Sequence, residues 1–327
     1  MFRIAIVIFL SFLMLSGTGW LVIWFIMSTS ITILNKLLMS IFLFNFPILI
    51  SFFHMALSTF ISIALKPKES DSELNISNNE YELLKRTFGL SLVFTFNIIF
   101  GNASLKLCSV SFVQVTKSIV PFITMILSFF VLGDSFSKHH IYACSLVCIG
   151  IALSFMGEMK VSSFGFLIVI FGCFLSALKT VLSKVLLSGT YQIDTDELII
   201  RLSPFSSIQT FFIFILSNEK MNLISSKTNF MTPIILMLIL ISCLLSYFLN
   251  YANFMATTYC TPVTIKIVGC LKQVSTVILS VLFFEKHISL INVFGIALTI
   301  MGSTYYSFIK KPTNNQNQFV VDEEEEI

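Results

Sequence analysis

Long apolar stretches separated by short polar segments run along almost the whole chain. Each stretch holds about 20 residues, which is enough for a helix to cross a hydrocarbon core of about 30 Å. The pattern predicts a first span near Leu13–Met39 and further spans near residues 47–65, 87–106, 111–132, 139–156, 163–187, 197–217, 232–257, 262–284 and 288–309. We therefore expect an all-α polytopic membrane protein with about ten transmembrane helices.

Composition supports a membrane protein and excludes several other classes. Charged residues make up 11% of the 327 residues and hydrophobic ones 56%, whereas about a quarter of a soluble domain is charged. The net charge of +3 is small and dispersed, so nucleic acid is not an expected partner. The seven cysteines lack metal-ligand spacing and are predicted to be packing residues. The four histidines form no catalytic or metal cluster, so neither catalysis nor a cofactor is expected.

A sequence repeat divides the chain into two halves. The segment Gly150-Ile-Ala-Leu-Ser-Phe-Met-Gly157 returns as Gly295-Ile-Ala-Leu-Thr-Ile-Met-Gly302, and the flanking residues Asn102 and Lys117 correspond to Asn253 and Lys272. The alternative is a chance match between apolar helices. Five spans per copy is an odd number, so the second copy must be inserted upside down. Inverted repeats are typical of secondary transporters, which bind substrate near the bilayer midplane.

This repeat defines the predicted domain organisation. Residues 1–157 form the first five-helix repeat, with a cytosolic loop at 66–86, and residues 158–309 form the second. Residues 310–327 are predicted to be a disordered, acidic cytosolic tail because they end in a run of glutamates. The distribution of basic residues favours cytosolic termini.

Several lysines fall inside the predicted spans, whereas no Asp or Glu lies well inside them. Lys117 and Lys272 lie near the middles of their spans, where a buried ammonium normally faces a water-filled cavity or a partner. An anionic ligand is the simplest such partner. Lys179 and Lys266 either join this cavity or snorkel toward an interface.

Polar and aromatic residues near these lysines extend the candidate site. Pro121 cannot donate a hydrogen bond to the carbonyl of Lys117, and such a break is tolerated where it lines a cavity. Gln114 lies in the same region. In the eighth span, an aromatic and polar stripe is predicted to contact a base or sugar or, as the alternative, to pack against a neighbouring helix; it consists of Tyr247, Asn250, Tyr251 and Phe254.

Several segments resemble the triose-phosphate translocator and nucleotide-sugar transporter families of the drug/metabolite transporter superfamily. They include Gly101-Asn-Ala-Ser-Leu-Lys106, Val110-Ser-Phe-Val-Gln-Val-Thr-Lys-Ser-Ile-Val-Pro-Phe122 and Gly269-Cys-Leu-Lys272. The resemblance covers roughly residues 15–310. It implies ten helices in inverted repeats, and by position Lys117 and Lys272 match two lysines that bind the substrate phosphate in phosphate translocators.

The chain also departs from the plastid-type translocators. Those proteins have an arginine after the second lysine, where this chain has Gln273, and a threonine where it has Gly101. A triose phosphate is therefore a less favoured substrate than a nucleotide sugar. Gln273, and Asn102 in the Asn-x-Ser-Leu motif, complete the candidate substrate-binding set with the lysines, Gln114 and the stripe.

The combined expectation is an antiporter that exchanges a nucleotide sugar or phosphorylated sugar for a nucleotide monophosphate or phosphate by alternating access. Its partners are these anions and membrane lipid, and a homodimer is left open. The Golgi or endoplasmic reticulum membrane is preferred. The alternatives are a triose-phosphate or phosphoenolpyruvate translocator of a plastid-like organelle and, less favoured, a membrane receptor or enzyme.

Overall fold

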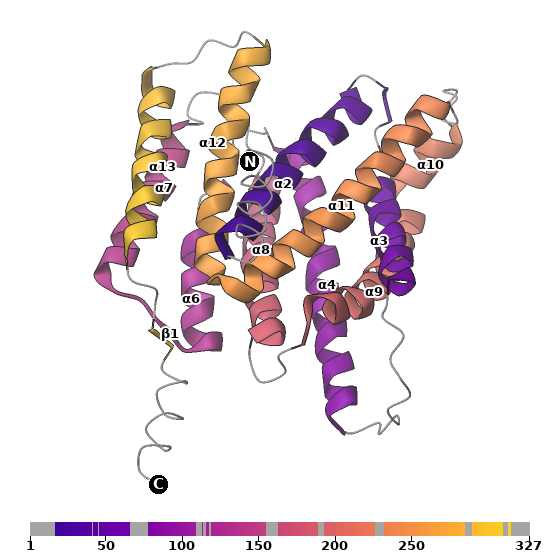
Figure 1. The fold of residues 1–327 in the computed structure, drawn as a ribbon. Helices are drawn as coiled ribbons and strands as arrows, with labels where there is room; N and C mark the ends of the chain where they lie inside the picture. The colour runs from indigo at the N-terminus through magenta and orange to yellow at the C-terminus, as the bar shows by residue number, and fades with distance from the viewer. Residues whose placement is uncertain are drawn as a thin grey trace, which may run out of the picture. The chain divides into compact units, whose positions relative to one another are not determined.

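The computed structural model describes residues 17–40, 42–44, 46–65, 78–108, 113, 116–117, 119–154, 163–188, 193–225, 232–284, 290–309 and 313–314 (Figure 1). Its helices are α2 (Gly17–Ser40), α3 (Pro47–Ala64), α4 (Asn78–Leu107), α6 (Val120–Leu132), α7 (Lys138–Ser154), α8 (Ser163–Ser188), α9 (Thr195–Leu216), α10 (Asn218–Ser225), α11 (Pro233–Tyr259), α12 (Pro262–Phe284) and α13 (Leu290–Phe308). Two short strands accompany them, β1 (Asp134–Ser135) and β2 (Thr313–Asn314). The helical architecture confirms the predicted fold class.

The helices have the lengths and compositions that a bilayer requires. Six of the described helices are long and apolar enough to cross a membrane, namely those within α2, α3, α4, α8, α9 and α11. Shorter apolar helices occupy Val120–Leu132, Lys138–Leu153 and Val293–Tyr306. Helix α12 carries Lys266 and Lys272 within its length. The count of ten crossings stays a prediction.

Large apolar side chains point outward and small polar ones point inward. On α4, Thr87, Ser91 and Thr95 are buried, whereas Phe88 and Phe96 are exposed. Lipid solvates apolar side chains well, and buried hydroxyls find partners within the bundle. Thr95, for example, donates to the amide oxygen of Gln209 on α9 at 2.8 Å. This distribution is the one expected of helices in a bilayer.

The polar segment predicted as the loop 66–86 is partly helical, because α4 begins at Asn78. Glu80 lies in its first turn, where the helix dipole favours a carboxylate. Glu82 forms ion pairs with Lys85 and Arg86, each at 3.7 Å, at the i,i+3 and i,i+4 spacings that stabilise helices. These local interactions extend the helix beyond its apolar part, so the predicted 66–86 segment is helical from residue 78 onward, while its cytosolic location stays a prediction. Residues 66–77 lie outside the described part.

The chain forms two compact units, and each draws on both sequence halves. The first unit contains residues 1–102 and 186–259, and the second contains residues 103–185 and 260–327. The boundary after residue 157 was drawn from the repeated sequence motif, whereas the two units are defined by which residues pack together. The two-repeat organisation therefore stays a prediction.

In the first unit, α11 packs against α2 and α3, and α3 packs against α9. The N-terminus of α3 is held by Glu219 of α10, whose Oε2 accepts hydrogen bonds from the backbone N–H groups of Ile48 at 2.9 Å and Leu49 at 3.3 Å. A carboxylate at this end satisfies donors that have no partner within the helix and opposes the positive end of its dipole. The short helix α10 was not predicted, since eight residues of low hydropathy resemble a loop.

A buried polar chain links three helices of the same unit. The hydroxyl of Ser242 donates to Oδ1 of Asn35 at 2.9 Å, and Ser242 Oγ lies 2.8 Å from Nε2 of His54. A hydroxyl has a single proton, so Nε2 of His54 must carry the proton of the second bond. His54, which is alone in its span by sequence, is thus tied to α11 and through it to α2.

In the second unit, α7 and α13 pack along most of their lengths, and α12 packs against α6, α7 and α13 (Figure 1). The repeated glycines make this close approach. A Cβ on Gly150 would lie 2.6 Å from the backbone nitrogen of Thr299, and one on Gly302 would lie 2.9 Å from the backbone nitrogen of Val147. Residue 150 of α7 thus lies beside residue 299 of α13, and the earlier residue 147 lies beside the later residue 302. The two copies of the motif therefore pack antiparallel, as an inverted pair should.

The connection between α6 and α7 has a defined backbone. Gly133 ends α6 in the left-handed conformation, with φ of 71°, and its N–H bonds the carbonyl of Ser128. Strand β1 then pairs antiparallel with β2. Residues 313–314 of the segment predicted to be a disordered tail thus form a strand, and residues 315–327 lie outside the described part.

Candidate functional site

The first candidate lysine lies immediately before a helix start. Helix α6 begins at Val120 with Pro121 in its first turn. The N–H of Ile119 bonds the carbonyl of Thr116 at 3.2 Å, which forms a tight turn beside Lys117. Proline is well suited to the first turn because its missing N–H would have no helical partner there. The predicted backbone break is therefore observed, and Lys117 precedes it.

Helix α8 packs against this break. Val113 and Val120 form a buried cluster with Val169, Cys173 and Ala177. The thiol of Cys173 donates to the carbonyl of Thr116 at 3.7 Å. Cys173 also lies within electrostatic range of Lys117. The side of α8 that carries Cys173 is thus the side that faces Lys117.

The second group of lysines lies on α12, whose start is fixed by local chemistry. Pro262 opens the helix, and Oγ1 of Thr261 accepts a hydrogen bond from the N–H of Thr264 at 3.3 Å, which is an N-terminal cap. From this start Lys266 falls in the second turn, and Lys272 follows about 1.7 turns later. They are six residues apart, or about 9 Å along the axis.

Four lysines of the second unit form one electrostatic cluster, which we call the lysine cluster: Lys117, Lys179, Lys266 and Lys272. Lys272 lies within range of Lys117. Lys266 lies within range of Lys179 and Lys272. Each of the four side chains is partly accessible rather than sealed. The structure therefore brings together three of the predicted site residues and adds Lys266.

Lys266 is fixed by a contact that the sequence could not supply. Its Nζ donates to Oγ of Ser176 on α8 at 3.0 Å. Ser176 lies three residues before Lys179, so both face the same side of that helix. Lys266 thus reaches from α12 to α8, and its part in a substrate cavity stays a prediction. The sequence offered one signal for including Lys266 in the candidate site, namely a second lysine within the same apolar span, about 1.7 turns before Lys272.

Negative charge within the described part of this unit is confined to Asp134, at the connection between α6 and α7. Asp134 is buried, and this burial raises the pKa of its carboxyl, while Lys184 acts in the opposite direction. Its charge partner is thus a lysine outside the lysine cluster.

The other predicted site residues are distributed as follows. Gln114 lies outside the described residues, as does the side chain of Gln273 on α12. Asn102 is partly buried near the end of α4 and belongs to the first unit. The stripe of α11 belongs to the first unit as well.

The aromatic stripe of α11 packs in part against a neighbouring helix. The ring of Tyr251 meets that of Trp20 on α2 edge to face, with centroids 5.7 Å apart, and that of Tyr247 at 6.4 Å. Phe254 is almost fully buried, whereas Asn250 and Tyr251 retain accessible surface. The packing interpretation accounts for Phe254, and the binding role of Tyr247, Asn250 and Tyr251 stays a prediction.

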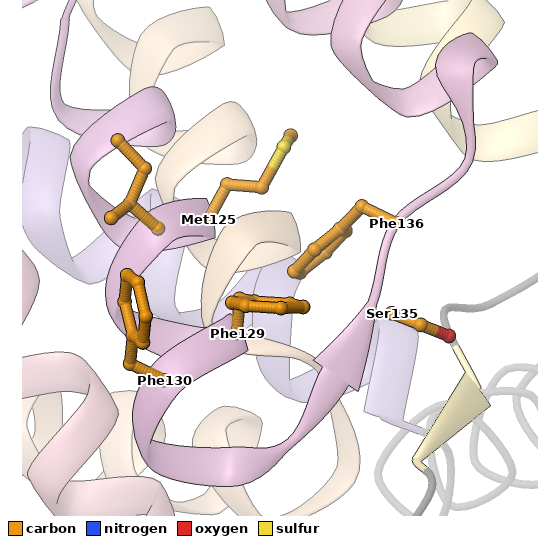
Figure 2. Close-up of a pocket in the computed structure, with 6 residues that line it drawn as sticks. Met125, Phe129, Phe130, Ser135 and Phe136 are labelled. Carbon is orange, nitrogen blue, oxygen red and sulfur yellow. The ribbon is translucent and has the colours of Figure 1, made fainter.

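A groove on the second unit has the wrong chemistry for an anion. It has a volume of about 300 Å³ and is lined by Met125, Ile126, Phe129, Phe130, Ser135 and Phe136. The rings of Phe129 and Phe136 point toward one another across it (Figure 2). No lining residue is charged, so we do not assign the substrate to this groove.

The long apolar helices and the lysines that lie within the bundle are typical of a multi-pass helical membrane transporter. Residues 16–307 match the Triose-phosphate Transporter family, and the chain belongs to that family. It is therefore a membrane transporter and not an enzyme.

Curated relatives have transport names of two kinds. UDP-galactose transporter 1 of Arabidopsis thaliana is 31% identical over 296 residues, covering 90% of this chain and 87% of the relative. A probable sugar phosphate/phosphate translocator of the same plant is 25% identical over 296 residues, covering 89% of this chain and 94% of the relative. A solved crystal structure resembles this fold with a TM-score of 0.66 at 14% identity, covering 90% of this chain and 100% of that one.

Proposed function

We propose that the protein is an antiporter that exchanges a nucleotide sugar for a nucleotide monophosphate by alternating access. The observation that carries this proposal is the lysine cluster in a unit whose only described acidic residue is Asp134. Lys117 and Lys272 bind the phosphoryl group of the substrate. The names of the protein's relatives support a sugar-linked anion as the substrate, since the chain is 31% identical to a UDP-galactose transporter.

Exchange rather than one-way transport follows from the electrostatics of an empty site. Two ammonium groups closer than about 8 Å repel by about 2 kcal/mol or more at an effective dielectric constant of about 20. A carrier that must occlude its site before reopening on the other side therefore needs an anion between Lys117 and Lys272. Substrate satisfies this need in one direction and the counter-anion satisfies it in the other.

A second candidate is a sugar-phosphate/phosphate exchanger. It is supported by the relative named as a probable sugar phosphate/phosphate translocator. The lysine pair would bind either phosphoryl group. Gln273 argues for the nucleotide sugar, because the sequence has an amide where plastid-type translocators have an arginine in addition to the two lysines.

We place the protein in the Golgi or endoplasmic reticulum membrane with both termini in the cytosol. Nucleotide sugars are anions that do not cross a bilayer unaided, so a compartment that consumes them requires such a carrier. Basic residues at the predicted 66–86 segment and at the start of the tail support this orientation.

The test is uptake by proteoliposomes preloaded with phosphate, UMP, GMP or CMP and offered labelled nucleotide sugars and sugar phosphates. We expect uptake of a nucleotide sugar only when the matching nucleotide monophosphate is inside. Uptake driven by internal phosphate would favour the second candidate. Uptake into vesicles that contain no counter-anion, at the same rate, would overturn antiport. Lys138→Gln, which removes an exposed positive charge of the same unit, serves as the control variant.

A further inference from the structure

The groove beside α6 opens on an exposed apolar surface of the second unit (Figure 2). Three of its lining residues on α6 are Ile126, Phe129 and Phe130, whose side chains are 56%, 55% and 77% exposed. In a helical membrane protein, exposed apolar side chains of this kind contact lipid rather than water. The groove is therefore continuous with the lipid-facing surface, and a membrane lipid is the class of ligand that can reach it.

The aromatic walls of the groove are fixed by contacts that do not involve a ligand. Phe136 packs edge to face on the ring of His140, with centroids 5.8 Å apart, and His140 in turn packs on Tyr306 at 5.5 Å. The rings of Phe129 and Phe130 meet edge to face at 5.3 Å. Phe129 and Phe136 point toward one another across the groove (Figure 2). The groove is thus a preformed hollow with rigid, flat walls.

The groove has one polar end and one apolar end. Ser135 lies in the connection between α6 and α7, which separates the predicted spans at 111–132 and 139–156. The other end is lined by Met125 and Ile126, about two turns before the end of α6. A ligand that matches this arrangement has an apolar body and a single polar group at the end that lies near the membrane surface.

The chemistry of the groove favours an uncharged, rigid ligand. Among the described residues that line it, none is charged. Asp134, the neighbour of Ser135 in the chain, lies within electrostatic range of Lys184 on α8, so these two charges offset each other. A phospholipid would bring a phosphate to a lining without a cation, whereas a hydroxyl can donate and accept hydrogen bonds there. A rigid ring system also loses less conformational freedom in a preformed hollow than an acyl chain does.

We propose that this groove binds a membrane sterol, with its fused rings against Phe129 and Phe136 and its hydroxyl group at Ser135. The volume of about 300 Å³ lies at the lower end of the range for small-molecule sites, so the rings occupy the groove and the alkyl tail stays in the bilayer. The sterol site shares no residue with the lysine cluster and does not depend on which anion is exchanged.

The experiment is photolabelling of the full chain in phosphatidylcholine proteoliposomes with a photoreactive cholesterol analogue, followed by mass spectrometry of the labelled peptide. Unlabelled cholesterol, additional phosphatidylcholine and phosphatidylserine are tested separately as competitors. Phe129→Ala and Phe130→Ala each remove one exposed ring of the groove. Phe294→Ala is the matched control, because Phe294 of α13 is 62% exposed in the same unit and does not line the groove. Melting temperatures show whether each variant is folded.

We expect label within residues 125–136 that unlabelled cholesterol displaces and the phospholipids do not. Phe129→Ala and Phe130→Ala should each weaken the apparent sterol affinity by about 5- to 30-fold, the range for losing about half of the burial of one phenyl ring. Phe294→Ala should leave the affinity unchanged. Lys138→Gln should leave it unchanged as well, because a sterol has no charged headgroup.

Absence of label from residues 125–136 would overturn the sterol site, as would label that cholesterol does not displace. Equal labelling of the wild-type protein and both groove variants would contradict it too. Displacement by phosphatidylserine, weakened by Lys138→Gln, would assign the groove to an anionic phospholipid instead. If Phe129→Ala does not fold, Phe130→Ala decides the question, because Phe130 is 77% exposed and its ring contributes little to packing.

Discussion

Replacement of Gly150 by alanine should separate α7 from α13. The added Cβ would lie 2.5 Å from Oγ1 of Thr299, 2.6 Å from its backbone nitrogen and 2.8 Å from the carbonyl oxygen of Gly295. Ordinary contacts of this kind exceed about 3.4 Å. Two of the three atoms belong to the backbone of α13, so no change of rotamer can relieve the overlap. The hydroxyl of Thr299 is itself bonded to the carbonyl of Gly295 at 2.9 Å.

The magnitude follows from two opposing effects. Overpacking typically costs 1 to 3 kcal/mol, and a clash with backbone belongs at the upper end of about 3 kcal/mol. Alanine in place of glycine within a helix returns about 1 kcal/mol. We therefore expect Gly150→Ala to lower the stability by about 2 kcal/mol, which for a unit of this size corresponds to a fall in melting temperature of about 4 to 8 °C.

The assay is thermal unfolding of the detergent-purified protein followed by intrinsic fluorescence. Gly89→Ala is the matched control, because a Cβ at Gly89 of α4 would meet nothing within 4 Å. It should leave the melting temperature unchanged or slightly raised. Adding Thr299→Ala to Gly150→Ala should restore only part of the loss, since the backbone contacts remain. A Gly150→Ala protein that melts at or above the wild-type temperature would refute the packing of the repeated motifs.

Three further predictions concern the first unit and the orientation. Glu219→Ala should lower the stability by about 1 to 3 kcal/mol, because the first turn of α3 loses a charged acceptor; Glu219→Gln, which keeps a carbonyl oxygen, should lose less on the same melting assay. Ser242→Ala should lower the stability by about 1 to 3 kcal/mol, because it leaves His54 without its buried acceptor. Ser242→Thr keeps the hydroxyl, so its melting temperature should stay within about 1 °C of the wild-type value. Asn75, which begins a glycosylation sequon, should stay unmodified in a secretory-pathway host; a mobility shift removed by endoglycosidase would reverse the orientation.

Much of the fold could be predicted because the bilayer imposes a simple rule on each crossing. The apolar stretches predicted helices at 47–65 and 163–187, and the structure has α3 at Pro47–Ala64 and α8 at Ser163–Ser188. The predicted span at 87–106 begins nine residues after the start of α4 at Asn78. Hydropathy does not detect a polar first part of a helix, which here is stabilised by the ion pairs of Glu82. The strand pair of β1 and β2 joins residues about 180 positions apart, and such a long-range pairing has no local signal.

The candidate site could be predicted in part. The cost of burying charge selected Lys117 and Lys272, and the structure places them within electrostatic range of one another. The same argument could not decide whether Lys266 points into the bundle or toward an interface. Its partner Ser176 lies on another helix, and the sequence does not show that the two residues are in contact. Similarly, the periodicity of the α11 stripe does not distinguish a ligand surface from the contact of Tyr251 with Trp20.

The most direct test of the central claim is nucleotide-sugar exchange by Lys117→Gln and Lys272→Gln in preloaded proteoliposomes, with Lys138→Gln as the control. Each cluster variant should weaken the apparent substrate affinity by about 10- to 100-fold, as loss of a charge-assisted bond predicts, while remaining folded by its melting temperature. The control should exchange at the wild-type rate. Normal exchange by both cluster variants would contradict the assignment of these lysines to the substrate.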